Sequence, residues 1–184
     1  MDFTKYQKRG AYHWKFYAQR GNKYRAHVDR IQHWVTNKSV LDVGAGDGLI
    51  TAKLSENGIV AIGIDNEPLA VQLAQEKGAN VILGDAYQIP FPNDTFEAVL
   101  MADALEHFER PIDALREAHR VLRQALYIST PPKRDDGKLT DKFHYQEWTP
   151  TELQALVESV GFRMAHQVVS YPAEKVMYGK FWKI

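Results

Sequence analysis

The chain has 184 residues, of which 45% are hydrophobic and 25% are charged, and its formal net charge is zero. This is the ordinary composition of a globular protein, at a length that fits one domain with a proper core. Because the chain has no cysteine, disulfides, thiolate metal sites and a cysteine nucleophile are excluded. No apolar run is long enough to cross a bilayer, and Met1 to Arg9 is polar and basic, unlike a signal peptide. We therefore expect a cytoplasmic protein with no membrane insertion.

The amino-terminal segment, residues 1–37, is basic and aromatic. Residues 1–38 carry nine Lys or Arg against Asp2 and Asp29, which gives +7 and leaves −7 for the rest of the chain. Apolar residues from Tyr24 to Val35 recur at helical spacing and predict a helix over residues 22–35. The segment is either an amphipathic cover with solvated cations or a lid over a bound cofactor and substrate. Its aromatic side chains could also stack on nucleic-acid bases, although no nucleic-acid motif accompanies them.

The stretch from Ser39 to Ile50 predicts a buried strand, a tight turn and the start of a helix. Glycines at positions 44, 46 and 48 let the backbone turn sharply and approach a ligand that a Cβ atom would repel. The pattern is G-x-G-x-G, because Leu49 stands where a dinucleotide-binding fingerprint has its third glycine. No P-loop lysine follows either.

The next two predicted strands each end near an acidic residue. Residues 59–64 form the second strand, and Asp65 follows it at the position where a carboxylate can accept hydrogen bonds from a ribose diol. The alternative is a helix N-cap, which Asn66 could equally provide. Residues 80–83 form the third strand, and after Gly84 come Asp85 and Ala86. Asp85 could accept a hydrogen bond from the amino group of an adenine, or it could simply stabilise a turn.

The remaining elements continue the alternation of strands and helices. We expect a fourth strand ending at Met101, a helix over residues 111–123 and a fifth strand over residues 125–130. This helix has Ile112, Leu115, Ala118 and Leu122 on one face. After a polar loop, a capping box of Thr149 and Glu152 predicts a helix that ends at Gly161, with Leu153, Leu156, Val157 and Val160 facing inward. Residues 162–170 and 175–184 read as two final strands.

Taken in order, these motifs resemble the type 11 (UbiE-like) branch of the class I S-adenosylmethionine-dependent methyltransferases. The resemblance covers residues 39–162 and rests on the glycine turn, the acid after the second strand, Gly84-Asp85-Ala86, and three further motifs. These are Ile89 to Met101, Ala104 to Phe108, and Pro111 to Leu122. Arg123-Gln124 replaces the Pro-Gly-Gly turn usual in the family, which implies a tighter connection into the fifth strand.

The resemblance implies an α/β fold, Rossmann-like and doubly wound. Its mostly parallel seven-stranded sheet should carry helices on both faces and end in a C-terminal antiparallel hairpin. We expect a single methyltransferase domain over residues 1–184, with residues 1–37 as a helical cover or lid and residues 38–184 as the core. The implied cofactor is S-adenosylmethionine, with S-adenosylhomocysteine as its product. The residues expected to bind it are Asp42, Gly44, Gly46, Gly48, Asp65, Asn66, Asp85, Ala86 and Asp103.

The implied reaction is methyl transfer by direct displacement, in which the cofactor supplies the leaving group. Such a reaction needs alignment and exclusion of water, and it requires neither a nucleophilic side chain nor a metal. A base is needed only for an acceptor that loses a proton, and His107 and His144 are the candidates. His107 could instead bond backbone at the start of a helix. Tyr12, Trp14 and His144 are candidate substrate contacts, and a small-molecule acceptor is expected.

Three alternative functions remain open from the sequence. Asp103, Glu106, His107, His144 and Glu147 partly match the metal site of small-RNA 3′-terminal 2′-O-methyltransferases, so a metal-dependent enzyme acting on RNA is one. Asp103 is shorter than the glutamate of that pattern, and we expect no metal. An NAD-dependent oxidoreductase is disfavoured by Leu49. A noncatalytic scaffold that binds S-adenosylmethionine is the third. The oligomeric state is open as well.

Overall fold

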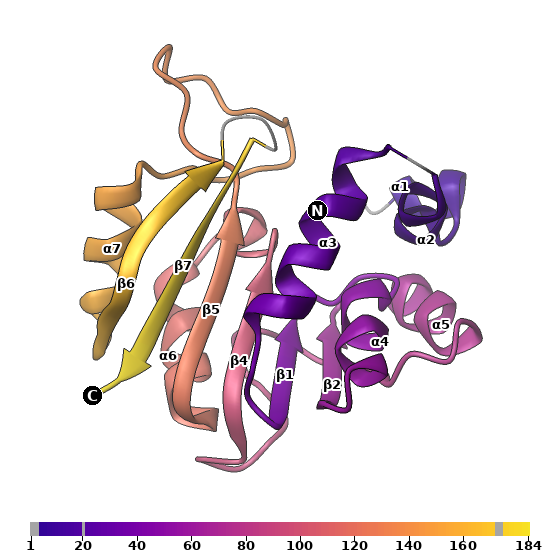
Figure 1. The fold of residues 1–184 in the computed structure, drawn as a ribbon, viewed down its shortest axis with the longest axis horizontal. Helices are drawn as coiled ribbons and strands as arrows, with labels where there is room; N and C mark the ends of the chain where they lie inside the picture. Colours follow the sequence, from indigo (N-terminus) through magenta and orange to yellow (C-terminus); the bar gives the residue numbers. More distant parts are fainter. Residues whose placement is uncertain (1–3, 20, 172–174) are drawn as a thin grey trace.

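A computed structural model describes residues 4–19, 21–171 and 175–184 of the chain. Its centre is one seven-stranded sheet in the order β3-β2-β1-β4-β5-β7-β6 (Figure 1). The strands are β1 (Ser39–Val43), β2 (Val60–Asp65), β3 (Val81–Leu83), β4 (Phe96–Ala102), β5 (Leu122–Thr130), β6 (Phe162–Tyr171) and β7 (Val176–Lys183). None of the described helices is long and apolar enough to cross a membrane.

Strands β1 to β5 run parallel, and β7 pairs antiparallel with both β5 and β6. The expected doubly wound, mostly parallel sheet and its C-terminal antiparallel hairpin are therefore confirmed. The chain turns outward in opposite directions from β1, first to β2 and β3 and later to β4 and β5. In such a sheet the ligand crevice lies beyond the carboxyl ends of the strands at this switch point.

Helices cover both faces of the sheet. On one face α3 (Lys23–Trp34) and α4 (Leu49–Glu56) pack on β1, β4 and β5 through residues such as Ile31, Leu54 and Leu100. On the other face α6 (Pro111–Val121) and α7 (Pro150–Glu158) pack through Leu115, Val157 and Phe181. Helix α5 (Pro68–Glu76) lies beside β2 and β3, and the short helix η1 (Leu105–His107) follows β4.

The amino-terminal segment forms two short helices before α3, namely α1 (Thr4–Arg9) and α2 (Tyr12–Ala18). Of the segment expected over residues 1–37, residues 1–3 and 20 lie outside the described part. Tyr6 and Tyr12 are buried against Ala70 of α5, so α1 and α2 stand at the carboxyl edge of the sheet (Figure 1). The predicted helix over 22–35 is confirmed as α3, with Asn22 as its N-cap: the Asn22 side chain accepts a hydrogen bond from Tyr24 N.

Two predicted helices end earlier than expected. Helix α6 stops at Val121 and β5 begins at once with Leu122, which pairs with Phe96 of β4 and is fully buried. Sheet pairing thus includes residues that the helical pattern had assigned to the helix, and α6 leads directly into β5, which is the tight connection that was expected. Of the predicted apolar face, Leu115 and Ala118 are fully buried and Ile112 is 40% exposed; Ala114 and Val121 are buried as well.

The carboxyl-terminal helix shows the same difference. Helix α7 stops at Glu158, and residues 159–161 form a turn. Leu153 and Val157 are buried as predicted, whereas Leu156 and Val160 are only partly buried. The predicted capping box is confirmed: Thr149 accepts from Glu152 N, and the Glu152 side chain accepts from Thr149 N.

Candidate functional site

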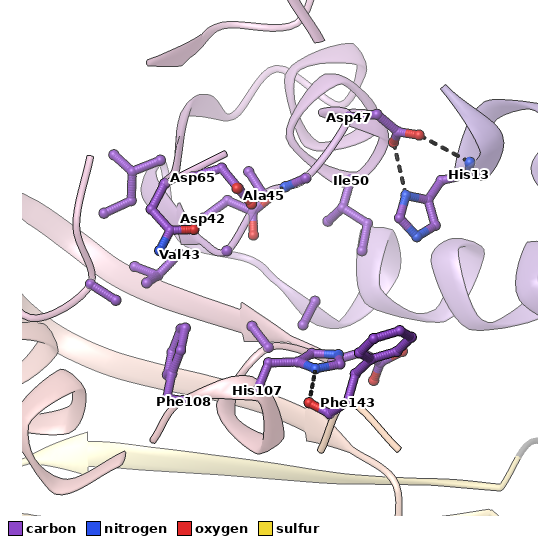
Figure 2. A pocket seen from close by; sticks show the side chains of 18 of the residues that line it. His13, Asp42, Val43, Ala45, Asp47, Ile50, Asp65, His107, Phe108 and Phe143 are labelled. Carbon is purple, nitrogen blue, oxygen red and sulfur yellow. Dashed lines mark hydrogen bonds and ion pairs between the residues drawn. The ribbon is translucent and has the colours of Figure 1, made fainter. Parts of the chain in front are cut away.

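A cavity of about 560 Å³ lies at the carboxyl edge of the sheet, where the switch point predicts a ligand. Its walls come from α1 and α2, the glycine turn after β1, the ends of β2 and β4, helix η1 and the loop that contains His144 (Figure 2). Of the residues predicted to bind a cofactor or substrate, ten line it: Tyr12, Asp42, Gly44, Gly46, Asp65, Asn66, Asp85, Ala86, Asp103 and His144. Gly48 and Trp14 do not.

The glycine turn has a left-handed backbone at all three glycines, with φ of 80° at Gly44, 57° at Gly46 and 75° at Gly48. Gly44 and Gly46 line the cavity. Gly48 instead faces the core, because a Cβ atom there would lie 2.5 Å from that of Ala79 and 2.8 Å from that of Ala74. Gly48 is therefore required for the packing of α4 against α5. It was predicted to approach a ligand, but it does not line the cavity.

Asp42 forms the floor of the cavity at the end of β1. Its side chain is only 2% exposed, and Oδ2 accepts a hydrogen bond of 2.7 Å from the hydroxyl of Thr51 in α4. Burial raises the pKa of the Asp42 carboxyl to about 7, although the bond from Thr51 opposes the shift. A cationic group entering the cavity would favour the charged form.

Asp65 closes β2 and holds the turn in place. Oδ2 accepts from Gly46 N at 2.8 Å, and Oδ1 accepts from Glu67 N at 2.9 Å. Burial raises the pKa of Asp65, and the two backbone donors oppose that rise. The N-cap of α5 is Glu67, whose side chain accepts from Leu69 N, so neither Asp65 nor Asn66 has the capping role. Each carboxylate oxygen keeps a lone pair that can accept from a ligand.

Asp85 and Asp103 also line the cavity. Asp85 Oδ1 accepts from Tyr87 N, so it stabilises its turn and also faces the cavity. Asp103 has a left-handed backbone, with φ of 48°. Its carboxylate accepts from Ser129 Oγ at 3.0 Å and lies 3.2 Å from Nε2 of the buried His27 in α3. Burial raises the pKa of Asp103, but His27 and Ser129 outweigh it and the net shift is downward.

The amino-terminal segment is held to the glycine turn by a contact that the sequence analysis missed. Asp47, which is fully buried, accepts from His13 N and from the His13 ring Nδ1, each at 3.0 Å (Figure 2). The indole of Trp14 donates to the Asp47 carbonyl at 2.8 Å, and Trp14 does not line the cavity. We call these three residues the clamp. No short-range pattern links positions 13 and 47, so only the fold could reveal the pairing.

Lys5 and Tyr6 of α1 also line the cavity and were not predicted. Burial lowers the pKa of Lys5, and the carboxylates of Asp65, Asp141 and Asp47 oppose this. The Tyr6 ring lies against Tyr12, with 5.4 Å between their centroids. Tyr6 and Tyr12 thus place aromatic faces over the same cavity that the acids line.

His107 and His144 face the cavity from η1 and from the following loop. Burial lowers the pKa of His107 to about 4, so its ring is neutral at physiological pH. Its Nδ1 lies 3.1 Å from the carbonyl of Phe143, and Nδ1 of His144 lies 2.6 Å from Oε1 of Glu147. A carbonyl or a carboxylate can only accept, so Nδ1 carries the proton in both rings and Nε2 is left as the acceptor. The two rings can each take a proton or bind a cation.

The charges of the lining fit a cationic nucleoside. Six aspartates of the described chain line the cavity, against the cations of Lys5 and Arg9: Asp42, Asp47, Asp65, Asp85, Asp103 and Asp141. S-adenosylmethionine carries a sulfonium and an ammonium group, which such a lining stabilises, whereas the two negative phosphates of a dinucleotide would be repelled. Asp65 can hold the ribose hydroxyls, and Asp85 with Ala86 can meet the adenine.

Comparison with known proteins agrees with this fit. The family model of a methyltransferase domain, type 11, matches residues 41–128. The chain is 37% identical over 91 residues to 2-methyl-6-phytyl-1,4-hydroquinone methyltransferase 1 of Oryza sativa subsp. japonica, a match that covers 46% of this chain and 27% of the rice protein. It is 32% identical over 136 residues to the uncharacterized methyltransferase YcgJ of Bacillus subtilis (strain 168), covering 64% of this chain and 54% of that protein. The chain thus spans about a quarter of the rice protein and about half of YcgJ.

Among solved structures, magnesium protoporphyrin IX methyltransferase of Synechocystis PCC 6803, with bound S-adenosylhomocysteine, has the same fold. The TM-score is 0.76 at 17% identity, and the match covers 98% of this chain and 97% of that one. At this identity the likeness concerns the fold alone. Residues 41–128 are thus similar in sequence to the type 11 methyltransferase domain family, and the chain has the fold of a solved methyltransferase.

Proposed function

We propose that this protein is an S-adenosylmethionine-dependent methyltransferase that transfers a methyl group to a small molecule by direct displacement. The observation that carries the proposal is the acidic cavity at the switch point of the sheet, with the glycine turn on one side and Asp65 at the tip of β2. The family match over residues 41–128 supports the same conclusion.

In this proposal the cofactor lies along the carboxyl ends of β1, β2 and β4. Asp65 and Asn66 bind the ribose, Asp85 and Ala86 meet the adenine, and the backbone of Gly44 and Gly46 approaches the methionine portion. Asp42 and Asp103 carry the negative charge that attracts its ammonium group. The cofactor supplies the activated methyl group, and the protein contributes alignment and exclusion of water.

The acceptor is proposed to enter between the histidines and the amino-terminal segment. Tyr12 and His144 line this part of the cavity, so both stay substrate-binding candidates, whereas Trp14 is engaged in the clamp. An acceptor hydroxyl must lose its proton, and Nε2 of His107 or His144 can take it. The rice relative is named for a hydroquinone acceptor, and hydroquinones are therefore the first class to test.

The proposal also concerns the organisation of the chain. Residues 1–184 act as one methyltransferase domain, and within residues 1–37 the described helices α1 and α2 act as a lid that the clamp holds closed over the cavity. RNA as an acceptor, and a cytoplasmic location, stay predictions from the sequence. An oxidoreductase using NAD would have to place a pyrophosphate among the aspartates of the lining, which the electrostatics disfavour.

Binding of S-adenosylhomocysteine and of NAD, measured by isothermal titration calorimetry, tests the cofactor. We expect the first to bind and the second not to bind. Replacing Asp65 by Asn removes the charge that holds the ribose. The substitution should weaken the binding of S-adenosylhomocysteine about 10- to 100-fold, since hydrogen bonds to charged groups contribute about 1.5–3 kcal/mol. Asp135→Asn, at an exposed loop position, is the matched control. Equal affinity of the Asp65 variant and wild type would overturn the assignment.

Turnover is tested separately by incubating the protein with S-adenosylmethionine and a panel of substituted hydroquinones, and measuring S-adenosylhomocysteine release. Release with one of them supports a methyltransferase. A protein that binds the cofactor but gives no release with any acceptor tried, RNA included, would be the noncatalytic alternative.

A further inference from the structure

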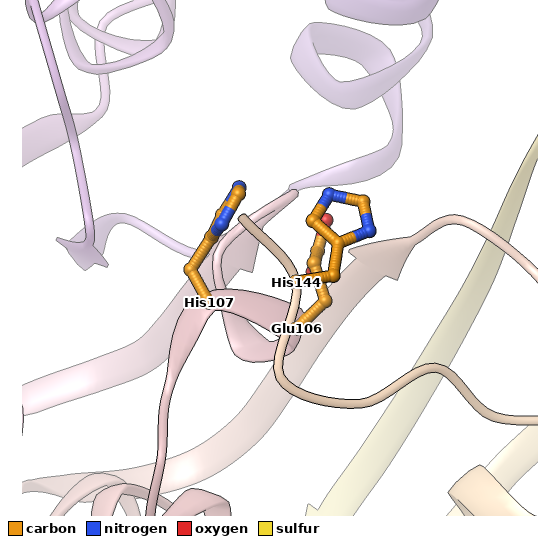
Figure 3. Close-up of side chains that lie close together, drawn as sticks. All are labelled: Glu106, His107 and His144. Atoms are coloured by element: carbon orange, nitrogen blue, oxygen red, sulfur yellow. The ribbon is translucent and has the colours of Figure 1, made fainter. Parts of the chain in front are cut away.

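Three metal-ligating side chains gather at the rim of the cavity, apart from the cofactor-binding turn. Glu106 and His107 lie side by side on η1, and His144 comes from the loop after β5 (Figure 3). One ligand atom from each of the three lies within 4.8 Å of the other two. The His107 and His144 rings are edge to face, with 4.8 Å between their centroids. Zinc donors at about 2.0–2.1 Å from the ion would be about 3.3 Å apart, so modest side-chain rotations suffice.

Both histidines are held as metal-binding histidines usually are. Nδ1 of His107 donates to the carbonyl of Phe143, and Nδ1 of His144 donates to Oε1 of Glu147. In metal sites the second ring nitrogen of a ligand histidine characteristically donates to a carbonyl or carboxylate, which fixes the tautomer and the ring orientation. Here Nε2 is the nitrogen left to bind an ion in each ring.

The carboxylate of the cluster, Glu106, is buried and, within the part of the chain that the structure describes, has an oxygen atom without a hydrogen-bond partner. Glu106 is 1% exposed, and that atom is its Oε2. A buried polar atom without a partner costs free energy, and a buried carboxylate is normally paired or bound to a metal. Glu106 also does not line the cavity, whereas His107 and His144 do. An ion between the three would thus be closed off behind and open toward the cavity.

We propose that Glu106, His107 and His144 bind one divalent transition-metal ion, with Glu147 as the outer partner that orients His144. Two imidazoles and one carboxylate suit Zn²⁺ or Mn²⁺ better than Mg²⁺, which prefers oxygen ligands. Asp103 is not part of the set, because its carboxylate is engaged by Ser129 and His27. Binding of the ion is independent of methyl transfer. Its use, holding an acceptor oxygen at an open coordination position, rests on the proposed function, and in that case His107 and His144 are ligands and not bases.

The test is a titration of metal-stripped full-length protein with ZnCl₂ by isothermal titration calorimetry, with no cofactor and no acceptor present. We expect one ion per chain. His144→Gln and Glu106→Gln should each weaken binding about 100-fold, and Glu147→Gln, which keeps all three ligands, about 10-fold. His33→Gln, at an exposed histidine on α3, is the matched control and should leave the affinity unchanged.

A second readout uses MnCl₂ and pulsed electron paramagnetic resonance, in which imidazole ligands give nitrogen couplings. These couplings should be present in wild type and reduced in His144→Gln. Circular dichroism and thermal unfolding of each variant report whether it folds. If Glu106→Gln fails to fold, His144→Gln carries the test, because His144 lies on a loop and not in the sheet.

The proposal is overturned if wild type binds no ion, or if the His144 and His33 variants lose affinity equally. The same samples are titrated with S-adenosylhomocysteine to separate the two hypotheses. A protein that binds S-adenosylhomocysteine but no ion would refute the metal site and leave the proposed function intact. A protein that binds the ion but no S-adenosylhomocysteine would refute the proposed function and leave the metal site intact.

Discussion

Gly48 and Asp65 show how far one residue can be understood from its type. The sequence pattern treats the three glycines alike, but the structure gives them two tasks: Gly44 and Gly46 face the cavity, and Gly48 fits between α4 and α5. Asp65 has two structural hydrogen bonds and a place at the cavity wall. A residue's chemistry was thus predictable, whereas its partner was not.

Substitution of Gly48 by Ala should be strongly destabilising. The added Cβ atom would meet the Cβ atoms of Ala74 and Ala79, and the backbone φ of 75° strains any residue with a side chain. We expect a loss of about 2–4 kcal/mol in the free energy of unfolding, from overpacking and strain together. Gly58→Ala, with φ of 79° but open space around it, should lose only about 1 kcal/mol. Urea denaturation compares the two, and equal losses would refute the packing role of Gly48.

At the scale of elements, the clamp decides where α1 and α2 stand. Asp47 lies within the glycine turn, so the hydrogen bonds that it accepts from His13 tie the amino-terminal segment to the cofactor side of the sheet. Tyr17 of α2 adds a bond of 2.9 Å to Asp29 of α3. A lid that is to open for ligand entry has to release the clamp while leaving the sheet intact.

Replacing Asp47 by Ala should loosen α1 and α2 without unfolding the protein. Charge-assisted hydrogen bonds contribute about 1.5–3 kcal/mol, so amide hydrogen exchange in residues 4–18 should accelerate about 10- to 100-fold. His13→Ala removes only the ring bond and should give a smaller increase. His33→Ala on the exposed side of α3 is the control. Uniformly faster exchange through the sheet would instead mean that Asp47 supports the whole fold.

At the scale of the whole molecule, the buried carboxylate of Asp42 links stability to pH. Burial raises the pKa of Asp42 to about 7 in the folded state, against an ordinary value of 3.8. The folded protein therefore binds this proton more tightly than the unfolded chain does. Its stabilising effect is complete below pH 4 and is lost as the pH rises through 7.

Asp42→Asn keeps an oxygen that can accept from Thr51 and removes the charge. In the absence of ligand, the variant should gain stability relative to wild type between pH 4 and pH 8, by on the order of 1–4 kcal/mol, since one pKa unit corresponds to about 1.4 kcal/mol. Urea denaturation at pH 5 and pH 8 measures the change. Asp135→Asn, exposed on its loop, should run parallel to wild type. Parallel curves for the Asp42 variant would contradict the linkage.

The order of strands and helices could be predicted because it is written in local patterns. Apolar runs, the capping box of Thr149 and the glycine turn after β1 act over a few residues, and each is confirmed. The helix boundary at Val121 was missed because Leu122 is apolar at a helical position. Its pairing with Phe96 of β4 involves a residue 26 positions away, and sheet pairing decided the boundary.

By itself the sequence determined the class of fold, the glycine turn and the acidic residues at or near the carboxyl ends of β1, β2 and β3, since strand ends and turn residues are local properties. Only the tertiary structure decided which distant groups meet, such as His13 with Asp47 and His27 with Asp103. These pairs come from elements that the chain brings together only when the sheet is assembled. Short-range sequence patterns do not predict such contacts, because the contacts form only when the whole core packs.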